Sequence, residues 1–296
     1  MQGALERLGD HDFFVRRWGD AHLPPMLLLH GFPEYGGAWS ELAPLLADRF
    51  HVIAPDQRGF GQSWAPAAVE DVRMHHLVAD MAHLLDANTP AVVMGHDWGA
   101  AVAYGLAMSR SELVSQLIIA NGVHPVPFQR ALAAGGAQTE ASQYIKYLRK
   151  EGSEDRLSAN NYAGLLKLFS ASMDLSWLDG DRLEEYRTEW ARPGRMRAMI
   201  NWYRASPLIV PAAGERADMP KLPLERLKVQ CPHLLIWGDK DTALLPEATE
   251  GLETFVPYLS RHHLENADHW LIHQEPEAVA RIVLDWASNE SVPTSG

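Results

Sequence analysis

The chain has 296 residues, long enough to bury about three quarters of the surface that the unfolded chain exposes. Hydrophobic residues make up 47% and charged residues 22%, and no apolar run approaches the roughly 18 residues of a membrane helix; since the start also lacks a secretory signal, we expect a soluble, cytoplasmic protein with no membrane partner. The 26 basic and 38 acidic residues give a net charge of -12, which argues against nucleic acid as a partner and favours small neutral molecules.

Taken in chain order, the first 125 residues alternate short apolar runs with helical patterns. The apolar runs are bounded by turn residues, whereas the segments between them repeat apolar residues at helical spacing. The expected order is strand 26–31, helix 37–48, strand 51–56, helix 73–87, strand 91–97, helix 98–109 and strand 114–122. This alternation predicts a parallel sheet wrapped by helices.

The strand-like runs stop after this region and return near the C-terminal end of the chain. Between them lie helical stretches rich in Tyr, Trp, Leu and Arg, interrupted by glycine and proline. Further strands are then expected at 233–239 and 260–266, and a last helix at 276–287. The pattern predicts an α/β core domain made of residues 1–125 and 223–296, with an all-helical cap domain inserted at 126–222.

The strongest chemical motif is GHDWGA at 95–100, where Asp97 stands between a predicted strand and a predicted helix. Open α/β sheets bind ligands at the carboxyl ends of their strands, so such positions are candidates for chemistry. Small residues two before and two after Asp97 permit the sharp turn of a nucleophile elbow, which presents its central side chain at the mouth of the sheet. The plainer interpretation is a helix N-cap, a position that suits Asp.

Two later strand ends supply partners for Asp97. The motif GDKD at 238–241 follows one predicted strand and His269 follows the next, which gives the order nucleophile, acid and histidine expected of this fold. Asp241 is the preferred orienting acid because of its Gly-x-x-Asp spacing, and Asp239 is the alternative. A solvated loop carboxylate and a packed or surface histidine are the non-catalytic interpretations of these residues.

The first strong strand ends in HGFP at 30–33. Its loop can place the backbone N–H of Phe32 opposite that of Trp98, and two such amides form an oxyanion hole. Pro33 restricts the loop and allows a cis peptide bond before it. The segment DQRGFGQS at 56–63 lacks the third glycine of a dinucleotide site, so we interpret it as a structural loop. We expect no cofactor and no metal.

Together these motifs resemble those of epoxide hydrolases of the α/β-hydrolase fold. The matching segments are HGFPE at 30–34, DQRGFGQS at 56–63, GHDWGA at 95–100, GDKD at 238–241 and ADHW at 267–270. In that family two cap tyrosines point at the nucleophile, and Tyr144 in SQYI and Tyr203 in NWYR are similar to them. Tyr147, one helical turn from Tyr144, is a competing candidate, and aromatic packing alone is the plainer interpretation of all three.

The resemblance implies a hydrolase acting on ether bonds, which opens an epoxide to a vicinal diol with water. The carboxylate of Asp97 is already ionised at neutral pH and attacks carbon, while the phenols of Tyr144 and Tyr203 protonate the departing oxygen. His269, held by Asp241, then activates water against the aspartyl ester. A small apolar epoxide is expected to contact His30, Pro33, Trp98 and Trp202.

Two other functions stay open from the sequence. Trp98 resembles the halide-binding tryptophan of haloalkane dehalogenases, which share the aspartate nucleophile, but those usually pair it with an Asn or a second Trp where this chain has Phe32. Haloacid dehalogenases of the fluoroacetate type resemble it less, since they carry an arginine after the nucleophile. The second alternative is a small-molecule sensor without turnover, although receptors of this fold typically keep a serine triad. Assembly into a homodimer also stays open.

Overall fold

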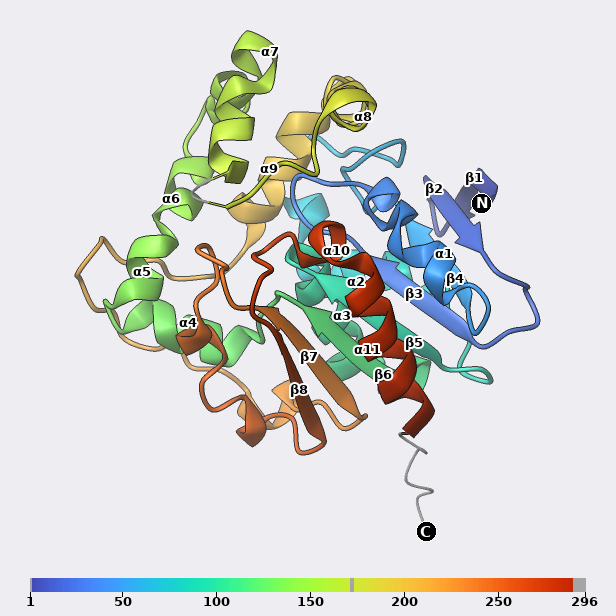
Figure 1. The fold of residues 1–296 in the computed structure, drawn as a ribbon. Helices are drawn as coiled ribbons and strands as arrows, with labels where there is room; N and C mark the ends of the chain where they lie inside the picture. Colours follow the sequence, from blue (N-terminus) through green and yellow to red (C-terminus); the bar gives the residue numbers. More distant parts are fainter. Residues whose placement is uncertain (1, 171–172, 290–296) are drawn as a thin grey trace.

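A computed structural model describes residues 2–170 and 173–289 of the chain (Figure 1). Within these residues, eight strands form one sheet in the order β1-β2-β4-β3-β5-β6-β7-β8. The strands are β1 Gln2–Leu8, β2 His11–Trp18, β3 Pro25–Leu29, β4 His51–Pro55, β5 Ala91–His96, β6 Val114–Ala120, β7 His233–Gly238 and β8 Leu259–Leu264. Pairing is parallel from β4 through β8 along this order, so the predicted mostly parallel sheet is confirmed. The tail at 291–296, which has the composition of a disordered segment, lies outside the described residues.

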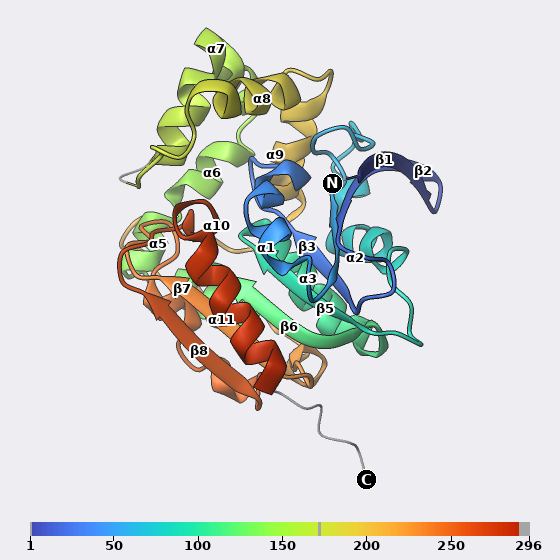
Figure 2. The same cartoon turned by 45° about the vertical axis from the view of Figure 1, so that its right-hand side comes forward.

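Helices cover both faces of the sheet (Figure 2). The helices of the core are α1 Leu42–Leu46, α2 Met74–Ala82, α3 Trp98–Ser109, α10 Leu271–Gln274 and α11 Pro276–Asn289. Alternate side chains of β3 point to opposite faces, as the pleat of a strand requires. Leu27 and Leu29 pack in one apolar cluster with α2 and α3, whereas Met26 and Leu28 pack in the other with α1 and α11. Burial on both faces explains why the central strands are continuous apolar runs.

In the described part of the connection between β6 and β7 lie six α-helices and a 3₁₀ helix at Leu224–Leu227. The α-helices are α4 Pro125–Ala133, α5 Ala137–Ala141, α6 Gln143–Arg149, α7 Ser153–Ser170, α8 Gly180–Trp190 and α9 Arg195–Ala205. Figures 1 and 2 show α6 to α9 gathered above one end of the sheet. Within α7 the chain turns at Asn160, Asn161 and Tyr162, which all have positive φ. In the described part of the chain between β6 and β7 there is no strand, which supports the proposed cap at 126–222.

The N-terminal hairpin of β1 and β2 is a difference from the sequence prediction, which placed no strand before residue 26. Most of β1 is exposed because it forms the outer edge of the sheet, so it carries no apolar run. In β2 the charged side chain of Arg16 is buried, and its guanidinium forms an ion pair with Asp56 from the loop after β4. The carboxylate of Asp56 also accepts backbone N–H groups of Gly36 and Gln62, each at 2.8 Å.

The helix expected at 37–48 is also different, because it divides into a 3₁₀ helix at Gly36–Ser40 and the short α1. Pro44 lies within α1 and has no N–H to donate to the preceding turn. Without this N–H, the Ser40 carbonyl has no helical donor at Pro44, so the 3₁₀ helix does not continue directly into α1. The helix ends two residues after Pro44, at Leu46, where the N–H of Ala47 donates to the Pro44 carbonyl. Proline therefore divides a segment whose apolar spacing alone indicates one longer helix.

Two buried histidines, His233 at the start of β7 and His124 directly before α4, are expected to make the fold sensitive to acid. The Nε2 atom of His233 lies 2.9 Å from the hydroxyl of Tyr104, and the Nε2–H of His124 donates to the Leu227 carbonyl at 2.7 Å. Burial lowers the pKa of His233 to about 3 and that of His124 to about 4, from 6.5. Below pH 6.5 the unfolded chain therefore binds protons that the folded chain does not.

The free energy of unfolding should consequently fall as the pH drops from about 6.5 toward the folded pKa values, by about 1.4 kcal/mol per pH unit for each of the two histidines. Urea unfolding at a series of pH values measures this slope. His233→Gln should remove about half of the histidine contribution; an unchanged slope in that variant would rule out His233 as the acid-sensitive group.

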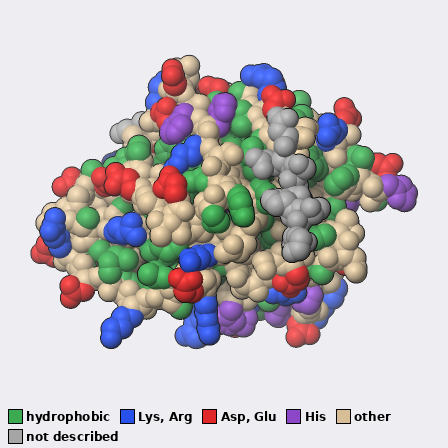
Figure 3. Space-filling model, turned by 90° about the horizontal axis from the view of Figure 1, so that it is seen from below, with side chains coloured by type: hydrophobic (Ala, Val, Ile, Leu, Met, Phe, Trp, Pro, Cys, Tyr) green, Lys and Arg blue, Asp and Glu red, His purple; other side chains and the backbone are tan. Residues whose placement is uncertain are grey.

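The face away from α7 and α8 carries acidic and basic side chains interspersed with one another (Figure 3). No helix among residues 2–170 and 173–289 combines the length and apolar content needed to cross a bilayer.

Candidate active site

Asp97 lies at the turn between β5 and α3, with φ 49° and ψ -120°. A positive φ is uncommon for a residue with a side chain, and it raises the carboxylate out of the sheet as an elbow does. Gly99 permits this turn because a Cβ there would collide with the main-chain oxygens of Leu29 and His30. Although Asp97 occupies the N-cap position of α3, its side chain makes no capping hydrogen bond to the helix.

The two oxygens of the Asp97 carboxylate have different partners. Oδ1 accepts the backbone N–H of Phe32 at 2.8 Å, whereas Oδ2 lies 3.6 Å from Nε2 of His269. Phe32 reaches this oxygen because Gly31 has no Cβ, which would collide with the Asp97 side chain. Pro33 follows a cis peptide bond, and its carbonyl accepts the indole N–H of Trp190 at 2.7 Å.

His269 lies between Asp97 and Asp241. Its Nδ1 atom is 2.7 Å from Oδ2 of Asp241, which comes from the loop after β7. The other candidate acid, Asp239, points elsewhere: its Oδ1 is 2.7 Å from Nδ1 of His263, and both side chains are substantially exposed. The geometry therefore brings Asp241, and not Asp239, to His269.

Charge and burial shift the pKa values of His269 and Asp241 in opposite directions. Burial alone would lower the pKa of His269, but the charges and hydrogen bonds of Asp241 and Asp97 hold it well above its usual value. Burial would raise the pKa of Asp241, yet the His269 charge and the hydrogen bonds from His269, Asn121 and Leu244 hold it below its usual value. The two carboxylates thus favour the protonated form of His269 before a reaction.

Two cap tyrosines face this group from α6 and α9. Burial, together with the charges of Asp97 and Asp241, raises the pKa of Tyr144. Burial also raises the pKa of Tyr203, with smaller contributions from Tyr144 and Asp97. The rings of the two tyrosines lie 6.1 Å apart. Both phenols therefore remain protonated at neutral pH and can donate a hydrogen bond.

The competing residue Tyr147 has a different environment. The guanidinium of Arg156 lies over its ring, 5.5 Å from the centroid. Ring contacts place the other two tyrosines at the elbow: Tyr203 packs edge to face on Phe32 and on Trp98, each at 5.1 Å, and Tyr144 packs on Tyr203. The structure therefore brings Tyr144 and Tyr203, and not Tyr147, to the nucleophile elbow.

The remaining predicted contact residues lie around this group. The ring of Trp98 packs edge to face on Tyr203 at 5.1 Å, and a hydrogen bond from Trp98 acts to lower the pKa of Tyr203, against the larger effect of burial. The indole N–H of Trp202 donates to the Arg58 carbonyl at 3.0 Å, and its ring packs on Phe60.

His30 is fully buried. Its Nδ1 atom is 2.9 Å from the Gly31 carbonyl, and its Nε2 atom accepts the N–H of Gln57 at 3.0 Å. Trp202 and His30 thus use their polar atoms to hold backbone.

Sequence reasoning assigned no role to Glu34, although it ends the HGFPE motif. Its carboxylate is 1% exposed and lies within hydrogen-bond distance of His273 at 2.6 Å, His96 at 3.1 Å and the Tyr186 hydroxyl at 3.1 Å. Burial would raise the pKa of Glu34, but His273 and His96 hold it well below its usual range. The second ring nitrogen of His96 lies 2.7 Å from the main-chain oxygen of His269. Glu34 therefore holds His96 in place, and His96 in turn contacts the main chain at His269.

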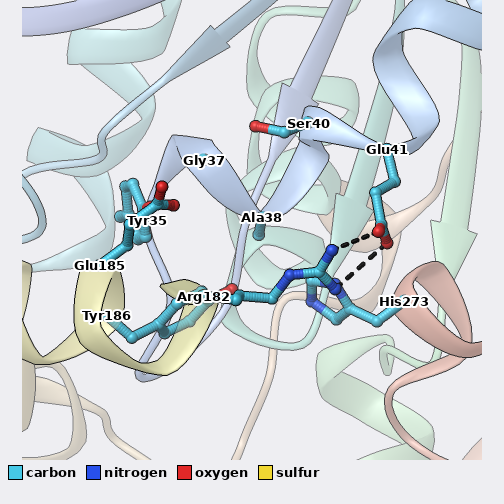
Figure 4. Close-up of a pocket in the computed structure, with 9 residues that line it drawn as sticks. All are labelled: Tyr35, Gly37, Ala38, Ser40, Glu41, Arg182, Glu185, Tyr186 and His273. Atoms are coloured by element: carbon cyan, nitrogen blue, oxygen red, sulfur yellow. Dashed lines mark hydrogen bonds and ion pairs between the residues drawn. The ribbon is translucent and has the colours of Figure 1, made fainter. Parts of the chain in front are cut away.

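A polar pocket opens where α8 meets the core (Figure 4). Arg182 of α8 reaches across it to form an ion pair with Glu41, and His273 and Tyr186 also contribute to its lining. The pocket is distinct from the group around Asp97, because none of its lining residues belongs to that group. Its ion pair joins the cap helix to the core.

Metal-ligating side chains do not cluster in the part of the chain that the structure describes: no group of three or more His, Cys, Asp or Glu residues there could hold a metal ion. The groups gathered at the elbow are a carboxylate, an imidazole, two phenols and the backbone amide of Phe32.

An elbow residue after β5, an acid after β7 and a histidine after β8 define an α/β hydrolase. The family model described as the alpha/beta hydrolase fold matches residues 24–276, and the chain belongs to this family.

Individual relatives make the assignment narrower. The chain is 32% identical to the AB hydrolase superfamily protein YfhM of Bacillus subtilis, over 90% of this chain and 91% of that protein. It is 30% identical to epoxide hydrolase 4 of Mus musculus, over 91% of this chain and 74% of the relative. The structure of an epoxide hydrolase from Bacillus megaterium is similar with a TM-score of 0.86 and 28% identity, covering 97% of this chain and all of the other. The chain is thus an epoxide-hydrolase-like enzyme of the α/β hydrolase fold.

Proposed function

We propose that this enzyme opens an epoxide to a vicinal diol through an ester on Asp97, which His269-activated water then hydrolyses. The observation that carries the proposal is the arrangement around one carboxylate. Oδ1 of Asp97 is held by the Phe32 amide and Oδ2 is 3.6 Å from His269, while two buried, protonated phenols face the same group.

In the first step, Oδ2 of Asp97 attacks an epoxide carbon and forms an ester bond, while the bond from that carbon to the ring oxygen breaks. A carboxylate is itself a nucleophile, so this step needs no base. The departing alkoxide is strongly basic, so Tyr144 or Tyr203 transfers a proton to it. The resulting phenolate regains a proton from solvent.

After the ester has formed, His269 releases its resting proton to solvent. In the second step, neutral His269 takes a proton from water, and the water oxygen attacks Cγ of Asp97. The negative charge develops on Oδ1, which the Phe32 N–H already contacts at 2.8 Å. The bond from Cγ to Oδ2 then breaks and protonated His269 returns the proton to the leaving diol. Ester formation prepares this step, because it removes the Asp97 charge that helps to raise the pKa of His269.

Dehalogenation is less well supported by the same site. A halide leaves without a proton and requires N–H donors, of which the Trp98 indole is the candidate. Here the ring of Trp98 packs edge to face on Tyr203, and the neighbouring loop contributes Phe32, which has no side-chain donor. The phenols, in contrast, match the need of an epoxide oxygen for a proton.

A direct assay separates the possible activities. The purified enzyme is incubated separately with styrene oxide and with 1-bromobutane, and diol and bromide are measured. Diol from the epoxide without bromide from the haloalkane is the expected result. Bromide release would indicate a dehalogenase, and binding of either compound without any product would indicate a sensor.

The two tyrosines are expected to substitute partly for one another. Each single variant, Tyr144→Phe or Tyr203→Phe, should lose about 10- to 100-fold in the rate of ester formation, and the double variant about 10³-fold or more, because no proton donor then remains for the alkoxide. Rapid-quench measurement of the protein adduct gives these rates. Tyr147→Phe is the matched control and should stay within about twofold of the wild type; a loss as large as that of Tyr144→Phe would contradict the assignment of Tyr144.

A further inference from the structure

Asn121 is a buried residue directly after β6 that makes contact with both sides of the site. It has 0% exposure and a positive φ of 35°. Its main-chain carbonyl accepts the N–H of Asp97 at 3.3 Å, and its own N–H donates to the Ile236 carbonyl in β7 at 3.1 Å. Because β6 lies between β5 and β7 in the sheet (Figure 1), Asn121 connects the elbow with the loop that carries Asp241.

The orientation of the Asn121 side-chain amide follows from its partners. Oδ1 accepts the backbone N–H of Gly238 at 2.6 Å, so Nδ2 must face the other way. Nδ2 donates to Oδ2 of Asp241 at 2.6 Å and lies 3.4 Å from the Gly238 carbonyl. A flipped amide would place oxygen against carboxylate and nitrogen against N–H, which both repel.

The same oxygen of Asp241 receives the hydrogen bond from His269. Oδ1 of Asp241 accepts the backbone N–H groups of Ala243 and Leu244, at 2.8 and 2.9 Å. Oδ2 accepts Nδ2 of Asn121 at 2.6 Å and is 2.7 Å from Nδ1 of His269. Asn121 therefore shares with His269 the oxygen that orients the imidazole, and it is the only side-chain donor beside His269 among these four contacts.

We propose that Asn121 is a positioning residue for the His269–Asp241 pair, and that its amide holds Oδ2 of Asp241 in place while His269 exchanges its proton with water. The inference rests on the proposed function, since it concerns the step in which the Asp97 ester is hydrolysed. It assigns no role to Asn121 in the attack on the substrate, because Nδ2 faces Asp241 and not the elbow carboxylate.

The geometry also distinguishes this role from a purely structural one. The main-chain contacts of Asn121 to Asp97 and Ile236 do not need its side chain, and glycine adopts a positive φ without strain. Asn121→Gly should therefore keep the backbone links and remove only the amide. Asn121→Asp keeps the shape but puts a second carboxylate 2.6 Å from Oδ2 of Asp241. Two charged oxygens repel strongly at that distance, so the pair would take up a shared proton as the pH falls from 8 to 6.

The test measures both half-reactions, using styrene oxide and rapid-quench mass spectrometry of the protein adduct. In Asn121→Gly, ester formation should stay within about threefold of the wild type and ester hydrolysis should fall about 10- to 100-fold, so that ester accumulates. In Asn121→Asp, hydrolysis should fall similarly near pH 8. Its rate relative to the wild type should rise at least about fivefold near pH 6, where the shared proton replaces the lost amide donor. Asn88→Asp, which adds the same charge on an exposed turn before β5, is the matched control.

Equal losses in both half-reactions, or hydrolysis by Asn121→Gly at the wild-type rate, would overturn the role of Asn121. A second, independent measurement is the titration of His269 by nitrogen NMR in the resting enzyme. This measurement does not require that an ester forms. Asn121→Asp should raise the pKa of His269 relative to the wild type, and an unchanged titration would also overturn the inference. If the wild type itself forms no ester, the proposed function fails, while the NMR result still decides whether Asn121 acts on His269.

Discussion

Asp97→Asn is expected to lower kcat/KM for an epoxide by about 10⁴-fold or more, because the amide has no charge with which to attack a saturated carbon. The change is nearly isosteric. The amide oxygen can still accept the N–H of Phe32, which contacts Oδ1 of Asp97 at 2.8 Å, so the elbow should keep its shape. Diol formation and the mass of the intact protein after mixing with epoxide measure the two consequences: no product and no adduct.

The matched control for this variant is Asp239→Asn. Asp239 belongs to the same GDKD motif as the proposed orienting acid, but its carboxylate contacts the exposed His263. Its loss should change kcat/KM by no more than about twofold, as for other exposed positions. If Asp97→Asn forms diol at a rate close to that of the wild type, a covalent role for Asp97 is excluded.

His269→Gln is expected to separate the two steps of the reaction. Ester formation should continue because the attacking carboxylate needs no base, whereas hydrolysis should slow by about 10³-fold or more because glutamine cannot take a proton from water. The enzyme should therefore convert about one equivalent of epoxide and stop. Digestion and mass spectrometry should locate the added mass on the peptide that contains Asp97.

The control for His269→Gln is His263→Gln, which removes the exposed histidine paired with Asp239 and should turn over normally. The account of the second step would be wrong if His269→Gln produced diol rapidly with an unmodified Asp97 peptide. An adduct on a different residue would instead identify that residue as the nucleophile, and the role of His269 in hydrolysis would be unaffected.

The core fold and the main candidate residues could be predicted from the sequence because both depend on local patterns. Buried parallel strands are continuous apolar runs, and the residues after them meet at one edge of the sheet. Asp97 and Asp241 each follow such a run, whereas His269 follows the more exposed edge strand β8, and the structure brings the three residues together. Asp241 could be preferred over Asp239 by spacing, and its contact with His269 agrees with that preference.

Asn121 and Glu34 could not be predicted in the same way. Each acts through side-chain hydrogen bonds to residues more than sixty positions away, such as Asn121 to Asp241 and Glu34 to His96. A polar residue after an apolar run was the available signal for Asn121, but the choice among such residues requires the register of β6 against β7. The hairpin of β1 and β2 was missed because an exposed edge strand does not need an apolar run.

The central claim is that the Asp97 side chain bonds to the substrate and that water later attacks its carbonyl carbon. A single turnover in heavy-oxygen water, with enzyme in excess over epoxide, tests this claim most directly. The account predicts unlabelled diol from that turnover and one heavy oxygen in the peptide that contains Asp97. Heavy oxygen in the diol with an unlabelled peptide would show that water attacks the epoxide directly, and it would contradict the account.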